Sequence, residues 1–191
     1  MNLPNIITLA RILLIPVFVL LYVLPWEWSH IAAAVLFGLA SLTDWLDGYL
    51  ARKMDQTTPF GAFLDPVADK LIVVSALIIL MAHHSNVWLT LPGIIIVARE
   101  IMISALREWM AEMNASLKVA VSLLGKVKTV LQMIGIAILL AIPPGENEQF
   151  VIMGYVLIYL AAAMTLWSMT VYLLAAWPTI KSGFSSLPRD S

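Results

Sequence analysis

Four aspartates, arranged in two pairs, have the residue type and spacing that suit metal chemistry. Asp44 and Asp47 are three residues apart, and Asp65 and Asp69 are four residues apart. On helices, the members of each pair share a face, and a short polar connection over residues 53–60 joins the two segments. Four converging carboxylates repel one another, and divalent cations that prefer oxygen ligands relieve this repulsion. The spacing therefore predicts a site for Mg²⁺, Mn²⁺ or Ca²⁺, and two such ions form a clamp for displacement at phosphorus.

Two glycines and one arginine flank these aspartates. Gly48 directly follows Asp47, and Gly61 lies one helical turn before Asp65. A residue without a side chain lets a ligand approach the backbone closely. Arg52, one turn after Gly48, is suited to binding a phosphate group. The same stretch therefore predicts binding of a phosphorylated ligand beside the metal.

The composition indicates an integral membrane protein. Of the 191 residues, 61% are hydrophobic and 12% are charged, and the mean hydropathy is +0.92. Long apolar runs of this kind are typical of membrane spans. Placing a carboxylate beside such a span costs free energy, so we expect these aspartates to have a function. The chain has no cysteine, which excludes disulfides and thiolate metal sites. Residues 1–5 contain no Lys or Arg, so we do not expect a cleavable signal peptide.

We expect one all-α domain over residues 1–177 with six transmembrane helices, followed by a polar cytoplasmic tail over residues 178–191. Residues 1–12 mix polar and apolar side chains and are expected to include a short amphipathic interfacial helix. The apolar runs place the six spans at residues 12–24, 31–51, 65–82, 87–107, 119–142 and 150–175.

The basic residues predict the orientation in the membrane. The loops at residues 25–30, 83–86 and 143–149 contain no Lys or Arg, and all 11 basic residues fall elsewhere. Because cytoplasmic loops carry the excess of Lys and Arg, we expect both termini and all four aspartates at the cytoplasmic side. A soluble, charged cosubstrate would meet the aspartates there.

The spacing of the motif supports a family assignment. The chain reads Asp-x-x-Asp-Gly-x-x-Ala-Arg from residue 44, then eight residues, then Gly-x-x-x-Asp-x-x-x-Asp from residue 61. This pattern resembles the signature of the CDP-alcohol phosphotransferase family, with agreement at every defining position. The resemblance implies a fold of six transmembrane helices, usually a homodimer, with a site open to both cytoplasm and membrane.

The resemblance also implies roles for the motif residues. Asp44, Asp47, Asp65 and Asp69 would hold two Mg²⁺ ions, or Mn²⁺, with Asp44 and Asp65 bridging. Gly48, Ala51 and Arg52 would lie against the cytidine diphosphate group. Asp69 would be the general base, although its spacing alone is equally consistent with a role as a metal ligand only.

A second group of charged residues occupies the fourth and fifth expected spans. Arg99 and Arg107 are eight residues apart and share a helix face, and Lys126 and Lys128 follow on the next span. These four cations form a candidate pocket for the phosphate of an acceptor substrate. An alternative for the two lysines is that they extend to lipid headgroups. We expect Glu100, Glu108 and Glu112 to form ion pairs with the two arginines.

Segments outside the aspartate motif narrow the resemblance and extend it over nearly the whole chain. They are Pro4-Asn5-Ile6-Ile7-Thr8-Leu9-Ala10-Arg11, Ala98-Arg99-Glu100, Ser104-Ala105-Leu106-Arg107-Glu108-Trp109 and Gly125-Lys126-Val127-Lys128-Thr129. These segments look like bacterial members that transfer a phosphatidyl group from CDP-diacylglycerol to glycerol 3-phosphate and release CMP. This narrower resemblance implies that Asn5, Thr8 and Gly61 also bind CDP-diacylglycerol, and that the protein lies in the bacterial cytoplasmic membrane.

Other functions remain open from the residues alone. Another family member would use inositol, inositol phosphate, serine or phosphatidylglycerol as the acceptor, and the basic residues favour a phosphorylated one. An ion-coupled transporter also carries acids in its membrane spans, but the aspartates here gather at one membrane edge. A lipid-binding scaffold would tolerate loss of all four aspartates. The choice of glycerol 3-phosphate over inositol phosphate depends on the resemblance.

Overall fold

The computed structural model describes residues 3–54, 59–112 and 123–185, and these residues are helical apart from short turns. Within these ranges the side chains of residues 3–7, 44–54, 59–63, 65, 66, 123, 124 and 182–185 lie outside the description. The described residues form six helices. They are α1 (Leu3–Val23), α2 (Ser29–Met54), α3 (Pro59–His84), α4 (Val87–Glu112), α5 (Leu123–Ala141) and α6 (Glu148–Ser185).

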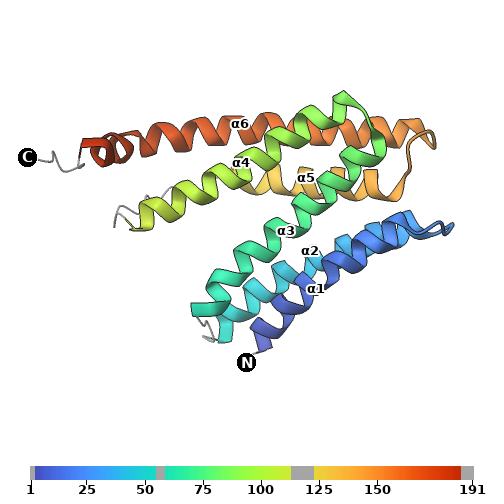
Figure 1. Ribbon diagram of the computed structural model, residues 1–191, viewed down its shortest axis with the longest axis horizontal. Helices are drawn as coiled ribbons and strands as arrows, with labels where there is room; N and C mark the ends of the chain where they lie inside the picture. Colours follow the sequence, from blue (N-terminus) through green and yellow to red (C-terminus); the bar gives the residue numbers. More distant parts are fainter. Residues whose placement is uncertain (1–2, 55–58, 113–122, 186–191) are drawn as a thin grey trace, which may run out of the picture.

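Helices α1, α2 and α3 form one group, α4 and α6 form another, and α5 packs against both. Helix α1 packs against both α2 and α3, and α4 packs against α6. Helix α5 contacts α6 most extensively and also packs on α2 and α3, so it lies between the groups (Figure 1). The start of α1 and the ends of α2, α4 and α6 lie at one end of the molecule, and the short turns after α1, α3 and α5 lie at the other.

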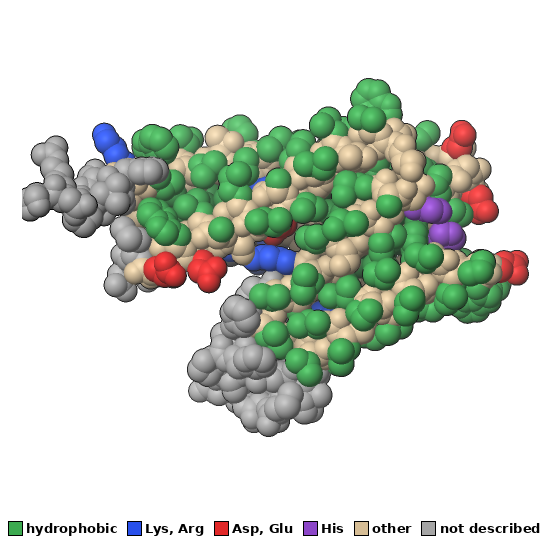
Figure 2. All heavy atoms as spheres, in the orientation of Figure 1, with side chains coloured by type: hydrophobic (Ala, Val, Ile, Leu, Met, Phe, Trp, Pro, Cys, Tyr) green, Lys and Arg blue, Asp and Glu red, His purple; other side chains and the backbone are tan. Residues whose placement is uncertain are grey.

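The core consists of large apolar side chains from every helix. Phe18, Phe37, Leu77, Ile136 and Ile158 have at most 1% of their surface exposed. The outer surface of the described residues is also largely apolar, and green side chains are spread along the helices in Figure 2. An exposed surface of this composition is suited to lipid rather than to water.

Three helices are long and apolar enough to cross a membrane in the described part of the chain. The segments are Val67–His84, Val87–Glu112 and Glu148–Lys181, and two shorter apolar helices cover Thr8–Val23 and Ser29–Thr43. A hydrocarbon core of about 30 Å needs about 20 helical residues. The structure thus confirms the all-α class, and it shows membrane-spanning length and hydropathy for three of the six expected spans.

The two terminal helices differ from the expected boundaries. Helix α1 runs without a break from Leu3 to Val23, so residues 3–12 are continuous with the first expected span. The reason is that Pro4 falls in the first helical turn, where proline is tolerated, and no other residue interrupts the helix before Pro16. The position of residues 3–12 at the membrane interface stays a prediction. Helix α6 continues through Pro178 to Ser185, ten residues beyond the expected end. The first part of the predicted tail is therefore helical, and the division at residue 177 stays a prediction.

A cluster of histidine and tyrosine side chains ties the helices together at the end of the bundle with the short turns. Tyr22 Oη and His83 Nδ1 share a hydrogen bond of 3.0 Å, as do Tyr155 Oη and His84 Nδ1. The ring of His30 lies 4.8 Å from that of Tyr22, edge to face. These contacts join α1, α2 and α6 to the C-terminal end of α3, the end far from Asp69.

Candidate active site

Helices α2 and α3 bring the four motif aspartates to one end of the molecule. Asp44 and Asp47 lie in the second half of α2, and Asp65 and Asp69 lie in the first half of α3. The two helices follow each other after a short connection and are in contact. Only the side chain of Asp69 is described, so the convergence of the four carboxylates stays a prediction. The side chains of Asn5, Gly48, Ala51, Arg52 and Gly61 likewise lie outside the description.

Asp69 borders a polar cavity of about 250 Å³ between α3, α4 and α5. Four of its lining residues are basic and two are acidic, so the lining carries more positive than negative charge. The charged residues are Asp69, Lys70, Arg99, Glu100, Arg107 and Lys128. Figure 2 shows basic side chains inside the hollow between the α4–α6 pair and the α1–α3 group. The cavity therefore suits an anionic ligand placed beside a carboxylate.

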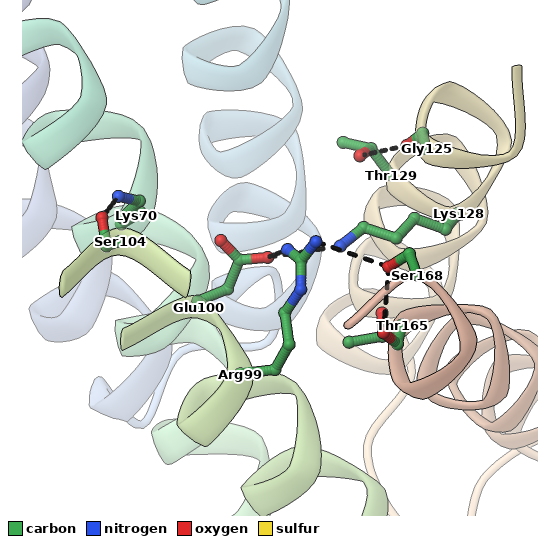
Figure 3. A network of polar contacts seen from close by, with 9 residues as sticks. All are labelled: Lys70, Arg99, Glu100, Ser104, Gly125, Lys128, Thr129, Thr165 and Ser168. Carbon is green, nitrogen blue, oxygen red and sulfur yellow. Dashed lines mark hydrogen bonds and ion pairs between the residues drawn. The ribbon is translucent and has the colours of Figure 1, made fainter. Parts of the chain in front are cut away.

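Two of the cations share a single carboxylate oxygen. Arg99 donates from Nη1 to Glu100 Oε1 at 2.6 Å, and Lys128 donates from Nζ to the same oxygen at 3.4 Å (Figure 3). Arg99 also donates from Nη2 to Ser168 Oγ of α6 at 3.4 Å. This network confirms the predicted pairing of Arg99 with Glu100. It joins α4, α5 and α6 at the wall of the cavity.

The two lysines of α5 have different surroundings. Lys128 is 5% exposed and lines the cavity, whereas Lys126 is exposed and is not among the cavity-lining residues. The alternative of extension to lipid headgroups is therefore wrong for Lys128, whose ammonium group points inward to Glu100. For Lys126, the role in acceptor binding stays a prediction.

Arg107 reaches the cavity from the C-terminal part of α4 and stacks on an aromatic ring. Its guanidinium carbon lies 5.4 Å from the centroid of the Tyr172 ring, within the range of a cation–π interaction. Tyr172 belongs to α6 and is 7% exposed. Helix α6 thus contacts both cavity arginines, Arg99 through Ser168 and Arg107 through Tyr172.

Lys70 and Gln132 belong to the cavity although the sequence alone did not single them out. Lys70 donates a hydrogen bond from Nζ to Ser104 Oγ, which links α3 to α4 beside Asp69 (Figure 3). Gln132 is 5% exposed and lies one helical turn after Lys128. Each is a polar residue one or four positions from a predicted site residue, and that spacing is the signal that could have identified them.

An apolar groove of about 500 Å³ begins on the other side of Asp69, between α2, α3 and α5. Its walls include Phe37, Leu42, Ile134 and Ala137. Asp69, Thr129 and Met133 line both this groove and the polar cavity. The Asp69 carboxylate therefore lies where a polar compartment meets an apolar one.

The donor set fits a hard divalent cation. Carboxylate oxygens are the preferred ligands of Mg²⁺ and Mn²⁺, and Asp69 is only partly buried at the junction of the two cavities. Among the side chains that the structure describes, no three His, Asp or Glu residues are placed to hold a metal ion. Three of the four motif aspartates lie outside that set.

Fold and site together define an all-α membrane protein with a carboxylate between a cation-lined cavity and an apolar groove. The CDP-alcohol phosphatidyltransferase family model matches residues 1–167, and the chain belongs to this family. The chain is 53% identical over 183 residues to a CDP-diacylglycerol–glycerol-3-phosphate 3-phosphatidyltransferase of Pseudomonas fluorescens, covering 95% of this chain and 93% of the relative. It is 52% identical over 175 residues to proteins of the same name from Escherichia coli K12 and Shigella flexneri serotype 5b, covering 92% of this chain and 94% of each relative.

Proposed function

We propose that this enzyme transfers the phosphatidyl group of CDP-diacylglycerol to the primary hydroxyl of sn-glycerol 3-phosphate. The products are phosphatidylglycerophosphate, a phospholipid precursor of phosphatidylglycerol and cardiolipin, and CMP. The observation that carries the proposal is the position of Asp69 between the polar cavity and the apolar groove. One substrate is a small anion and the other is a lipid, and the two compartments match them. The names of the relatives support the same reaction.

The polar cavity is the proposed acceptor site. A phosphate monoester carries a charge of about −1.5 to −2 at pH 7, and the cavity lining has two more cations than carboxylates. Arg99 and Arg107 offer planar donor groups that match phosphate oxygens, and Lys128 adds an ammonium group. This charge favours a phosphorylated acceptor over inositol or serine. The relatives favour glycerol 3-phosphate over inositol phosphate.

The apolar groove is the proposed path for an acyl chain of CDP-diacylglycerol. Its walls come from α2 and α5, and their neighbouring surfaces are apolar and exposed. We place the cytidine diphosphate group against Gly48, Ala51 and Arg52, with Asn5, Thr8 and Gly61 as further contacts. Thr8 is 1% exposed on α1, so it would contact the substrate through its backbone or after side-chain movement.

The chemical step follows from these positions. Asp44, Asp47, Asp65 and Asp69 would hold two Mg²⁺ ions, or Mn²⁺. When bound, the metal neutralises negative charge at the phosphates. Asp69 accepts the proton of the glycerol 3-phosphate hydroxyl. The hydroxyl oxygen forms a new bond to the phosphorus that carries diacylglycerol, and the bond from that phosphorus to the CMP oxygen breaks.

The cellular setting is part of the same proposal. All six helices would span the bacterial inner membrane, with both termini and the site at the cytoplasmic side and residues 178–191 as a cytoplasmic tail. The described helices alternate in direction as this topology requires. The family resemblance supports a homodimer.

The test is CMP release by purified protein in mixed micelles with CDP-diacylglycerol and Mg²⁺, across a panel of acceptors. We expect release that depends on glycerol 3-phosphate and stops with EDTA. CMP release with a different alcohol would support the proposed mechanism but identify a different acceptor. Absence of release with every acceptor, from protein shown to be folded, would exclude the enzyme and favour a transporter or a scaffold.

A further inference from the structure

Glu100 is an acidic residue in the wall of a cavity that is otherwise suited to binding an anion. Its Oε1 atom accepts from Arg99 at 2.6 Å and from Lys128 at 3.4 Å. The side chains of Arg99, Glu100 and Lys128 are 14%, 22% and 6% exposed, so the group is largely shielded from water. One oxygen atom therefore neutralises two cations from two different helices.

The burial of these cations explains why an anion is needed between them. An ammonium group that loses most of its water is costly unless an opposite charge lies close to it. Lys128 lies in a cavity that also contains Arg99, Arg107 and Lys70, all of the same charge. Glu100 supplies the compensating charge from within the protein, and a bound phosphate group would supply it from outside.

The same geometry sets up a competition. A phosphate oxygen that bonds to Arg99 Nη1 and Lys128 Nζ together would take the position that Glu100 Oε1 occupies, because a single atom there already contacts both donors. A carboxylate and a phosphate held side by side would repel each other. Phosphate binding therefore includes the cost of separating Glu100 from its two partners.

We propose that Glu100 is an internal substitute for the acceptor phosphate. It bridges Arg99 and Lys128 when no acceptor is bound, and it gives up their hydrogen bonds to phosphate oxygens when the acceptor enters. Glu100 thereby weakens anion binding and keeps it reversible. The inference rests on the proposed function in so far as the ligand is a phosphorylated acceptor.

The decisive variant is Glu100→Gln, which keeps the size of the side chain and removes its charge. The affinity of purified protein for inorganic phosphate is measured by thermal unfolding over a phosphate titration, because a ligand stabilises the folded protein according to its concentration and affinity. Ionic strength is held constant with chloride. No CDP-diacylglycerol or metal is added, so turnover is not required.

We expect Glu100→Gln to bind inorganic phosphate at least about fivefold more tightly than the unmodified protein, the lower end of typical coupling between two sites. Without phosphate, the variant should unfold at a lower temperature. Glu108→Gln is the matched control, since Glu108 is exposed on the same helix and is not among the cavity-lining residues. Its phosphate affinity should equal that of the unmodified protein. Unchanged or weaker binding by Glu100→Gln would show that Glu100 only positions the cations, and would overturn the proposal.

Glu100→Asp covers the case in which Glu100→Gln does not fold. This carboxylate is one methylene shorter and keeps its charge, so phosphate affinity should rise by less than in Glu100→Gln but remain above that of the unmodified protein. Equal or weaker affinity would again overturn the proposal. A phosphate effect of Glu100→Gln without CMP release would refute only the proposed function. CMP release from glycerol 3-phosphate without the phosphate effect would refute only the role of Glu100.

Discussion

Asp69 of α3 and Thr129 of α5 each line two compartments at once, the polar cavity with its four cations and the apolar groove. A side chain at such a boundary can contact a water-soluble acceptor and the phosphate end of a lipid in one bound state. The reaction that we propose requires this arrangement, because its substrates come from the cytoplasm and from the membrane. The following predictions test the two compartments and the contacts that shape them.

Asp69→Asn should reduce CMP release by at least about 10²-fold, the lower range for loss of a general base. The amide cannot accept the hydroxyl proton at neutral pH, and it is a poorer ligand for a divalent cation. We expect the variant to remain folded and to bind CDP-diacylglycerol, as measured by size-exclusion chromatography and by binding of a labelled substrate. Glu108→Gln is the control for loss of an acidic residue elsewhere. Near-normal turnover by Asp69→Asn would contradict its role as the base.

Gly38→Leu should obstruct the apolar groove without disturbing the packing of α2. Gly38 lines the groove, and a Cβ atom added there meets no atom within 4 Å. Displacing two methylene groups of a lipid costs about 0.8 kcal/mol each, which raises the KM for long-chain CDP-diacylglycerol about 15-fold. Micelle assays with long and short acyl chains measure the effect.

The matched control for the groove is Leu39→Phe, because Leu39 is the next residue, is exposed and does not line the groove. It should leave both KM values unchanged. For Gly38→Leu, the KM for glycerol 3-phosphate should also stay the same. An equal loss of activity with long and short chains would show that the groove does not hold an acyl chain.

Tyr172→Leu should weaken binding of glycerol 3-phosphate, because the aromatic ring that supports Arg107 is lost. A partly exposed cation–π contact is worth about 0.5–1 kcal/mol, so the KM for the acceptor should rise about two- to fivefold. Tyr172→Phe keeps the ring and removes the hydroxyl group, which lies 3.9 Å from Met110 Sδ. Its KM should stay near that of the unmodified protein. Equal effects of the two variants on KM would refute a role of the ring.

Gly154→Ala should destabilise the packing of α5 against α6 by about 1–3 kcal/mol, the usual cost of overpacking. A Cβ atom at Gly154 would lie 2.7 Å from Cγ and Cδ2 of Leu139, and Leu139 is fully buried and has little room to move. Gly38→Ala is the control, since its Cβ atom meets open space. Thermal unfolding in the same detergent should show a lower midpoint for Gly154→Ala only. A similar midpoint for both variants would show that Leu139 adjusts at no cost.

Much of the fold could be predicted from the sequence because the chain marks most helix ends locally. Asn86 caps α4 by accepting from the Trp88 backbone N–H at 3.0 Å, and Gly145 adopts a φ of 92° in the turn before α6. Both lie where polar and turn-forming residues interrupt the apolar pattern. The helices extend beyond the expected span boundaries at the start of α1 and the end of α6, where the polarity of the chain changes but no residue ends the helix. Helix α6 continues past residue 175 and through Pro178 to Ser185.

The sequence by itself determined the chemistry that is available: oxygen ligands at Asp44, Asp47, Asp65 and Asp69, cations at Arg99, Arg107, Lys126 and Lys128, and apolar helices to hold them. The pocket predicted from the sequence included both Lys126 and Lys128, although residues two apart do not share a helix face. Only the tertiary structure decided that Lys128 faces inward and Lys126 outward, and that Glu100 lies between Lys128 and Arg99. Glu100 and Lys128 are on different helices, so their contact depends on how α4 and α5 pack against α3 and α6. That packing depends on contacts between residues far apart in the chain, and no local pattern in the sequence records it.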